Sequence, residues 1–197
     1  MTVTLTRVCA AVVAAVIALP VSACGGSPGS VSAPSAPAST VHTPASTVHN
    51  SDDVMFAQHM IPHHQQAIAM AAMVPSHTAN AALRVVAIHI STDQRAEISI
   101  LTDMLNEWGA PTAGPGPMSM QGMVDDATMH RLPSLSGAEF DTVWITAMIG
   151  HHQGAVTMAQ AELAHGRSPA AQNMARLIIN AQQREISYMT DLISTPE

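Results

Sequence analysis

Apolar residues recur at intervals of three and four positions through most of the chain after residue 51. This is the period of helices that bury one face, and the alternating pattern of strands is absent. Breaks at proline and glycine divide the pattern into four predicted helices, which run from about Asp53 to Val74, from near Thr78 to Trp108, from Ser136 to Gly166, and from Ser168 to about Ile193.

Local signals set the expected helix ends. Pro75 is expected to stop the first helix, and Gly109 to end the second. Ser136 and Glu139 have the spacing of a capping box, and Ser168-Pro169 supplies a capping residue followed by a proline at the first helical position. The connections are therefore short, long and short. This order predicts an all-α, ferritin-like four-helix bundle made of two repeated helical hairpins joined by a long crossover loop.

The two predicted hairpins match each other at one constant offset. Asp53 corresponds to Asp141 (141 − 53 = 88) and Glu97 to Glu185 (185 − 97 = 88). The segment Met60-Ile61-Pro62-His63-His64-Gln65 has the counterpart Met148-Ile149-Gly150-His151-His152-Gln153 in the same register. Two separate blocks in one register indicate an internal repeat. Pro62 and its counterpart Gly150 both weaken a helix, so we expect a kink before each His-His pair.

The first fifty residues have a different character. Residues 1–23 are predicted to be a lipoprotein signal peptide, because a short apolar run ends in Ser22-Ala23 directly before Cys24, as in the bacterial lipobox. An ordinary secretory signal cut nearby is the alternative. Residues 24–50 predict a lipidated Cys24 and a disordered tether, in which His42 and His49 belong either to a plain spacer or to a weak metal-scavenging arm. The bundle is then expected to span residues 51–195, with the protein anchored on the extracytoplasmic face of the cell membrane.

The amino-acid composition limits which partners and which metal ligands are possible. The seven basic residues are all Arg and the formal net charge is −7, which argues against a nucleic-acid partner. Methionine reaches 14 residues and histidine 11, whereas the only two cysteines are Cys9 and Cys24. A metal site in the bundle would therefore depend on His, Met or carboxylate ligands.

The repeated His-His pairs are the leading candidates for such a site. On helices, His63 and His64 share an arc with methionines and small alanines, while Glu97 and Glu185 lie on apolar stripes where an unpaired carboxylate would be costly. We expect the His pairs of the first and third helices to meet these two carboxylates. The candidate metal ligands in the bundle are His63, His64, His151, His152, Met60, Met70, Met148, Met158, Glu97 and Glu185. The alternative is a buried His/Glu network that only fixes helix packing, with Met as gap filler.

The long connection adds a second group of soft donors at Met118, Met120 and Met123. Thioethers in a Gly/Pro loop favour Cu(I) or Ag(I), whereas zinc and iron fit this ligand set less well. The alternative is a loop that tucks its Met side chains onto the bundle. Glu162 and His165 have the Glu-x-x-His spacing of di-iron bundles, but the first hairpin has Val74 in place of the Glu, which argues against a ferritin-type oxidase. His77 and His165 lie at helix C-termini, where capping is the expected role.

Three of these segments carry a resemblance to a known family. The segments are Met60–Ala67, the Met-rich loop with Leu135–Asp141, and Met148–Ala155. They resemble the bacterial domain of unknown function family 305, over about residues 51–193. The resemblance implies a ferritin-like bundle in exported proteins, some of which bind copper and are linked to copper or silver tolerance.

Together these features predict an exported, lipid-anchored protein that sequesters or transfers Cu(I) or Ag(I) and is not an enzyme. Two other functions stay open at this stage: a ferritin-like metal-dependent oxidoreductase, and a structural lipoprotein without metal.

Overall fold

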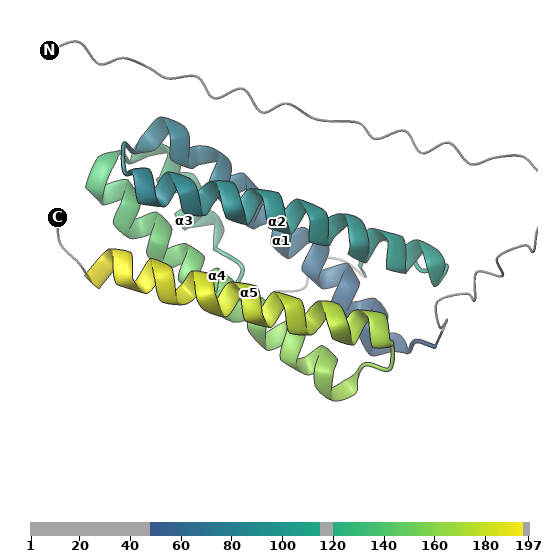
Figure 1. Cartoon of the computed structure of the whole chain (residues 1–197). Helices are drawn as coiled ribbons and strands as arrows, with labels where there is room; N and C mark the ends of the chain where they lie inside the picture. The colour runs from purple at the N-terminus through teal and green to yellow at the C-terminus, as the bar shows by residue number, and fades with distance from the viewer. Residues whose placement is uncertain (1–47, 115–119, 195–197) are drawn as a thin grey trace, which may run out of the picture. The chain divides into compact units, whose positions relative to one another are not determined.

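The computed structural model describes residues 48–114 and 120–194 as an all-helical bundle (Figure 1). Four long helices make up the bundle, and a short helix and a single 3₁₀ turn lie in the connection between its halves. In chain order the elements are α1 (Ser51–His77), α2 (Ala81–Glu107), α3 (Asp126–Arg131), the 3₁₀ turn Leu132–Ser134, α4 (Gly137–His165) and α5 (Pro169–Ser194). The predicted fold class is confirmed, while α3 was not predicted.

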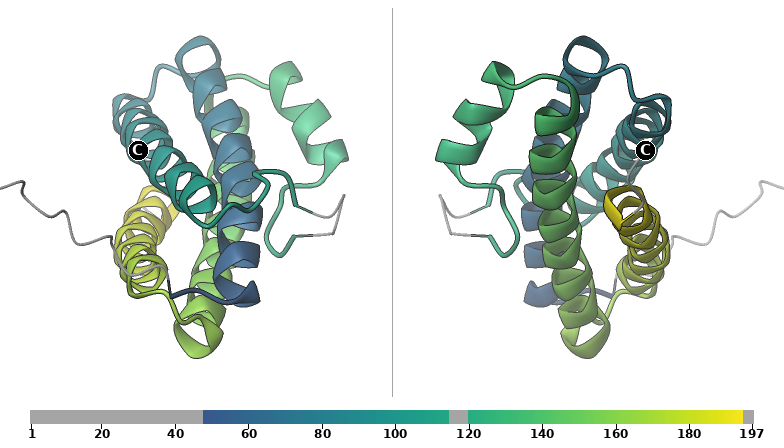
Figure 2. Two further views of the ribbon diagram at one scale, coloured as in Figure 1. Left: turned by 90° about the vertical axis from the view of Figure 1, so that its right-hand side faces the viewer. Right: turned by 90° about the vertical axis from the view of Figure 1, so that its left-hand side faces the viewer.

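The bundle consists of two antiparallel hairpins, α1 with α2 and α4 with α5, which meet where α1 packs on α4. Views along the bundle show α2 and α5 on one side of the α1/α4 pair (Figure 2). On the other side lie α3 and the described part of the crossover connection between α2 and α4, residues 108–114 and 120–136 (Figure 2). Contacts between Asp53 and Ser168, His63 and His151, and Met70 and Trp144 show that α1 and α4 run in opposite directions. Each of the two sequence repeats thus folds into one helical hairpin, α1 with α2 and α4 with α5.

Several predicted helix ends differ from those in the structure. Pro75 does not stop α1, which continues to His77, because the last turn is closed by the Thr78 N–H on the Val74 carbonyl. The capping residue of α2 is Asn80, whose side chain accepts from the Leu83 N–H, so that helix begins after Thr78. The capping box predicted at Ser136 is wrong.

At that position Ser136 precedes α4 without a capping hydrogen bond from its side chain. The next residue, Gly137, has a φ of 59°, a left-handed conformation that turns the backbone away from the geometry of the box. A complete capping box occurs instead at α1, where Asn50 and Asp53 bond each other's backbone N–H groups. Ser168 does cap α5, accepting from the Ala171 N–H at 3.3 Å.

Asp53 also ties the two hairpins together. Its buried carboxylate accepts hydrogen bonds from the Arg167 and Ser168 N–H groups, at 3.0 and 2.8 Å, at the start of α5. Burial pushes the pKa of Asp53 upward, but hydrogen bonds from the backbone of Ser168, Asn50 and Arg167 outweigh it and lower the pKa. The first turn of α1 is thereby fixed against the far end of the second hairpin.

The apolar core is divided in two. One cluster, around Leu83, Trp144 and Met148, fills the end of the bundle near α3. The other, around Phe56, Leu101 and Ile178, fills the opposite end. Between them lies a layer of buried polar residues, and that layer contains both His-His pairs.

Several predictions concern residues outside the described part of the chain. The signal peptide, the lipidated Cys24, most of the tether and Met118 all belong to this group. Of the helices in residues 48–114 and 120–194, none is both long enough and apolar enough to span a membrane.

Candidate metal centre

The four paired histidines lie together in the middle of the bundle. Helical spacing places His63 and His64 on the inner arc of α1, and the repeat places His151 and His152 on α4. All four side chains are 0–1% exposed. Since a histidine is seldom fully buried without a partner, each ring needs an explanation.

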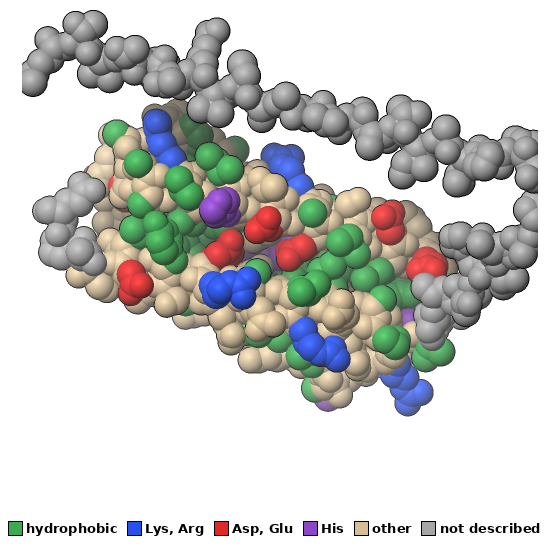
Figure 3. Space-filling model, viewed as in Figure 1, with side chains coloured by type: hydrophobic (Ala, Val, Ile, Leu, Met, Phe, Trp, Pro, Cys, Tyr) green, Lys and Arg blue, Asp and Glu red, His purple; other side chains and the backbone are tan. Residues whose placement is uncertain are grey.

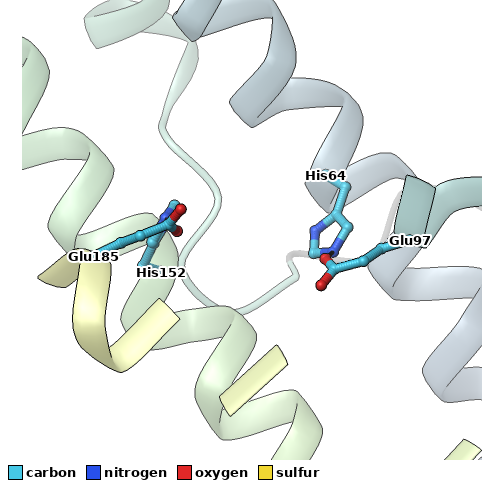
Figure 4. Close-up of polar contacts among 4 residues, drawn as sticks. All are labelled: His64, Glu97, His152 and Glu185. Atoms are coloured by element: carbon cyan, nitrogen blue, oxygen red, sulfur yellow. Dashed lines mark hydrogen bonds and ion pairs between the residues drawn. The ribbon is translucent and has the colours of Figure 1, made fainter. Parts of the chain in front are cut away.

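His64 and His152 each bind one carboxylate. The His64 Nε2 atom lies 2.7 Å from Glu97 Oε2, and the His152 Nε2 atom lies 2.7 Å from Glu185 Oε2. Figure 4 shows the two pairs apart from each other, one between α1 and α2 and the other between α4 and α5. The predicted meeting of the His pairs with Glu97 and Glu185 is confirmed for these two rings.

The carboxylates of these pairs reach toward the surface formed by α2 and α5, since the side chains of Glu97 and Glu185 are 15% and 19% exposed. A groove there is lined by His89, Asp93 and Arg184 together with Glu185. Acidic side chains gather near the middle of this face, with a histidine beside them (Figure 3). The polar layer therefore connects to solvent through its carboxylates.

His63 and His151 meet each other instead. Their ring centroids are 3.7 Å apart with the ring planes 33° from parallel. Neither ring makes a well-aligned hydrogen bond at Nδ1 or Nε2, although the Gln121 backbone lies near enough to His63, and the His63 backbone to His151, to act on their pKa values. A buried polar group left unpaired costs about 1–3 kcal/mol, so the folded protein holds two imidazoles in a position that packing alone does not favour.

Both central rings are neutral at physiological pH. Burial, with added repulsion from His64 and His152, lowers the pKa of His63 from 6.5 to about 3. Burial also lowers the pKa of His151, with repulsion from His63, His152 and His64 adding to the effect. A neutral imidazole keeps one nitrogen lone pair free, which is the form that binds metal ions.

Two glutamines complete the buried layer, and the sequence reasoning missed them. Gln94 and Gln182 are 2% exposed, and their side-chain amides have no hydrogen-bond partner. They precede Glu97 and Glu185 by one helical turn and correspond to each other at the same offset (182 − 94 = 88). This repeated spacing of a polar residue on a buried stripe was the signal that could have revealed them.

The predicted methionine ligands divide between the two apolar clusters. Met70 and Met148 belong to the cluster near α3, and Met60 to the cluster at the other end, against which Met158 packs. Thioethers therefore lie on both sides of the histidine layer. Met158 also lines a groove farther along α1 and α4, with residues from the first turns of α1.

The crossover connection passes directly over α4 beside His151. Gly122 has a φ of 83°, and a Cβ atom there would lie 2.6 Å from the Gly154 Cα atom. On the other side, Gln66 of α1 exchanges two hydrogen bonds with the backbone of Val124, at 2.8 and 2.9 Å. This contact explains why glycine stands at position 154 where the first repeat has Gln66.

The same connection forms one wall of a groove of about 480 Å³ that leads to His151. Met123 lines this groove together with Asp125 and Gly150. Met120 is half-buried in the same connection. Of the three predicted loop ligands, Met123 thus lies near the histidine layer, and Met118 is outside the described residues.

Ionisable side chains alone form no candidate metal cluster in the part of the chain that the structure describes. Within residues 48–114 and 120–194, no three His, Cys, Asp or Glu side chains are grouped so that they could hold an ion without other donors. Glu162 lies ten residues beyond His152 on α4, about 15 Å along the helix, and is buried beside Asp53. Burial and the neighbouring Asp53 raise the pKa of Glu162 to about 8.

Comparison with known proteins agrees with this architecture. The family model described as "Domain of unknown function (DUF305)" matches residues 53–193. A DUF305 protein of Streptomyces coelicolor is 31% identical with a TM-score of 0.69, covering 73% of this chain and 91% of that one. A DUF305 fragment from Deinococcus radiodurans is 32% identical with a TM-score of 0.69, covering 74% and 97%.

A third similar structure is CopM in its Cu(I)-bound form, with 29% identity, a TM-score of 0.62, and coverage of 72% of this chain and 95% of that one. CopM is also known in Ag-bound and Cu(II)-bound forms. No curated protein matches the chain. With a family model that spans the whole bundle, the chain belongs to the DUF305 family.

Proposed function

We propose that this protein is an exported, lipid-anchored binding protein for Cu(I) or Ag(I), which sequesters the ion or passes it on outside the cytoplasm. The observation that carries the proposal is the His63–His151 contact, in which four buried ring nitrogens make no well-aligned hydrogen bond. A soft cation bound there would satisfy two of them and offset the unfavourable burial.

The surroundings of the two rings support a soft monovalent ion. Both imidazoles are neutral, and the thioethers of Met60 and Met148 lie one turn away on the same helices. The carboxylates of Glu97 and Glu185 do not meet the two central rings. They bind His64 and His152 and orient those rings. CopM, whose fold and sequence are similar, binds Cu(I) and Ag.

The groove beside Met123 supports a route of entry. It opens to solvent and reaches His151, which is itself only 1% exposed. An ion captured by a loop thioether would have a short path to the buried rings. The hydrogen bonds between Gln66 and Val124 hold this wall of the groove in place.

Export and anchoring rest on the sequence before the bundle, where Ser22-Ala23-Cys24 follows an apolar run. One relative bears the name of a secreted protein, which supports export. A structural role without metal is less consistent with the site, because a network that only fixes packing would pair its buried nitrogens. The lack of a repeated Glu-x-x-His spacing supports binding in place of oxidase chemistry.

The test is a competition titration of the protein against a Cu(I) chelator under reducing conditions. The wild type is compared with a variant in which His63, His64, His151 and His152 are all replaced by Phe, and with the milder H63F/H151F variant, which keeps both His–Glu pairs. Circular dichroism controls for folding. We expect the tightest Cu(I) site to disappear in both variants. Unchanged affinity in a folded H63F/H151F protein would reject the proposal.

A further inference from the structure

A second group of soft donors lies outside the histidine layer, in a small cavity between the first half of α1 and the last half of α4. The cavity measures about 140 Å³. Its walls carry two thioethers, from Met55 and Met158, and two imidazoles, from His59 and His165. The carboxyl groups of Asp52 and Glu162 lie at the same cavity.

Helical spacing explains why these side chains face one another. On α1, Asp52, Met55 and His59 follow at intervals of three and four residues, and on α4 Met158, Glu162 and His165 do the same. Because α1 and α4 run in opposite directions, with His63 opposite His151 and Asp53 beside Ser168, Met55 and Met158 lie at the same height of the groove. His59 is then one turn farther toward the histidine layer.

The internal repeat supplies a comparison for this groove. At offset 88, the counterparts of Asp52, Met55 and His59 are Phe140, Val143 and Ala147. At that end of the bundle the space is filled by apolar packing, with Phe140 and Trp144 at 0% exposure and His77 stacked on Phe140 at 4.9 Å. Packing between α1 and α4 therefore requires only apolar residues, and the donors at the other end need a separate explanation.

Glu162 places a second buried carboxyl group, besides Asp53, at this end of the bundle. Its counterpart in the first repeat is the fully buried Val74, whereas Glu162 is 2% exposed and its carboxyl group lies within hydrogen-bonding reach of the buried Asp53 carboxyl group. Two neighbouring buried carboxyl groups are unfavourable when both are ionised, and a cation in the cavity beside them would offset that cost.

We propose that Met55, His59 and Met158 form a second binding site for Cu(I) or Ag(I), with the carboxyl group of Glu162 beside it. Two thioethers and one imidazole are a soft donor set, which suits these ions better than zinc or iron. Met55 is 41% exposed, so the site is open to solvent, unlike the histidine layer. His59 lies four residues before His63, about 6 Å along α1, which makes the groove a capture site next to the buried rings.

This site does not depend on metal binding by the central histidines, so the two can be tested apart. The full chain is labelled with ¹³C at the methionine methyl groups and titrated with Ag(I), in the wild type, in M55L/M158L and in H63F/H151F. Leucine keeps the bulk of Met and removes the sulfur. The control is M73L, because Met73 is a partly buried methionine at the opposite end of the bundle, and its counterpart in the second repeat is Ala161.

We expect Ag(I) to shift the Met55 and Met158 methyl signals in the wild type, in M73L and in H63F/H151F. The M55L/M158L variant should bind one Ag(I) equivalent fewer than M73L, and replacement of His59 by Gln should weaken the same site at least tenfold. Unshifted Met55 and Met158 signals would overturn the inference. So would an unchanged Ag(I) stoichiometry in M55L/M158L, or the loss of all Ag(I) binding in a folded H63F/H151F protein.

Discussion

The rings of His63 and His151 lie with their centroids 3.7 Å apart where α1 crosses α4, and none of their four nitrogens makes a well-aligned hydrogen bond. Their sequence neighbours His64 and His152 bind Glu97 and Glu185. The two histidines of each pair thus have different partners. One ring turns outward to a carboxylate on the same hairpin, and the other turns to its counterpart in the other hairpin.

The central rings should make the metal-free protein sensitive to acid. Their folded-state pKa values are lowered, to about 3 for His63, whereas in the unfolded chain both are near 6.5. Below pH 6.5 the unfolded state therefore binds more protons, and stability should fall toward pH 3 by about 1.4 kcal/mol per pH unit for each ring. Urea unfolding between pH 7.5 and 4.5 measures this slope. The slope should become smaller in H63F/H151F, and equal slopes in the two proteins would contradict the assignment.

The contribution of Glu162 to stability should have the opposite pH dependence. Its folded pKa is raised to about 8 from 4.5, so its contribution to stability is complete below pH 4.5 and is lost as the pH rises toward 8. The E162Q variant should match the wild type at pH 4 and be more stable at pH 8 by more than 1 kcal/mol. As a control, E139Q alters an exposed ion pair with Arg131 and should change stability by less than about 1 kcal/mol. Equal stability of E162Q and wild type at pH 8 would show that Glu162 is already ionised.

The contact between the crossover connection and α4 can be tested at two glycines. A Cβ atom at Gly154 would lie 2.6 Å from the carbonyl carbon of Gln121, whereas one at Gly150 would meet nothing within 4 Å. We expect G154A to lose about 1–3 kcal/mol of stability and to expose Met123 to solvent. The matched variant G150A should be neutral or gain up to about 1 kcal/mol from helix propensity. Thermal unfolding and the oxidation rate of Met123 are the measurements, and equal behaviour of the two variants would refute the close approach.

Membrane attachment is predicted to depend on Cys24, which precedes the described residues. Labelling cells with a fatty-acid analogue should tag the wild type, because the lipobox-like sequence predicts a lipid on this sulfur. The C24A variant should lose the label and be released from the membrane fraction. C9A is the control and should behave as wild type, since Cys9 lies in the predicted signal peptide. Retention of C24A at the membrane would exclude this anchor.

Much of the fold and half of the site follow from sequence spacing. The offset of 88 and the helical period place His64 and His152 opposite Glu97 and Glu185, as the structure confirms. Which histidine of each pair meets the carboxylate could not be predicted, because both share one arc of the helix. That choice is made by the crossing of α1 on α4, a property of the packed bundle.

Other features could not be predicted from the sequence, because local signals compete with tertiary contacts. Pro75 removes only one hydrogen bond near the end of α1, and the remaining bonds of the last turn keep the helix going to His77. The groove of Met55, His59 and Met158 combines residues about one hundred positions apart without an exact repeat. Periodicity identifies a buried face, but it does not say which residues of two helices share a cavity.

The most direct test of the central claim is nitrogen NMR of the imidazole rings, with the signals assigned through H63F, H151F and H130Q. In the metal-free protein His63 and His151 should remain neutral from pH 5 to 8. One equivalent of Cu(I) should shift an unprotonated ring nitrogen of both residues while leaving that of the exposed His130 unchanged. If Cu(I) is bound and the nitrogens of His63 and His151 do not move, the buried pair is not the metal site.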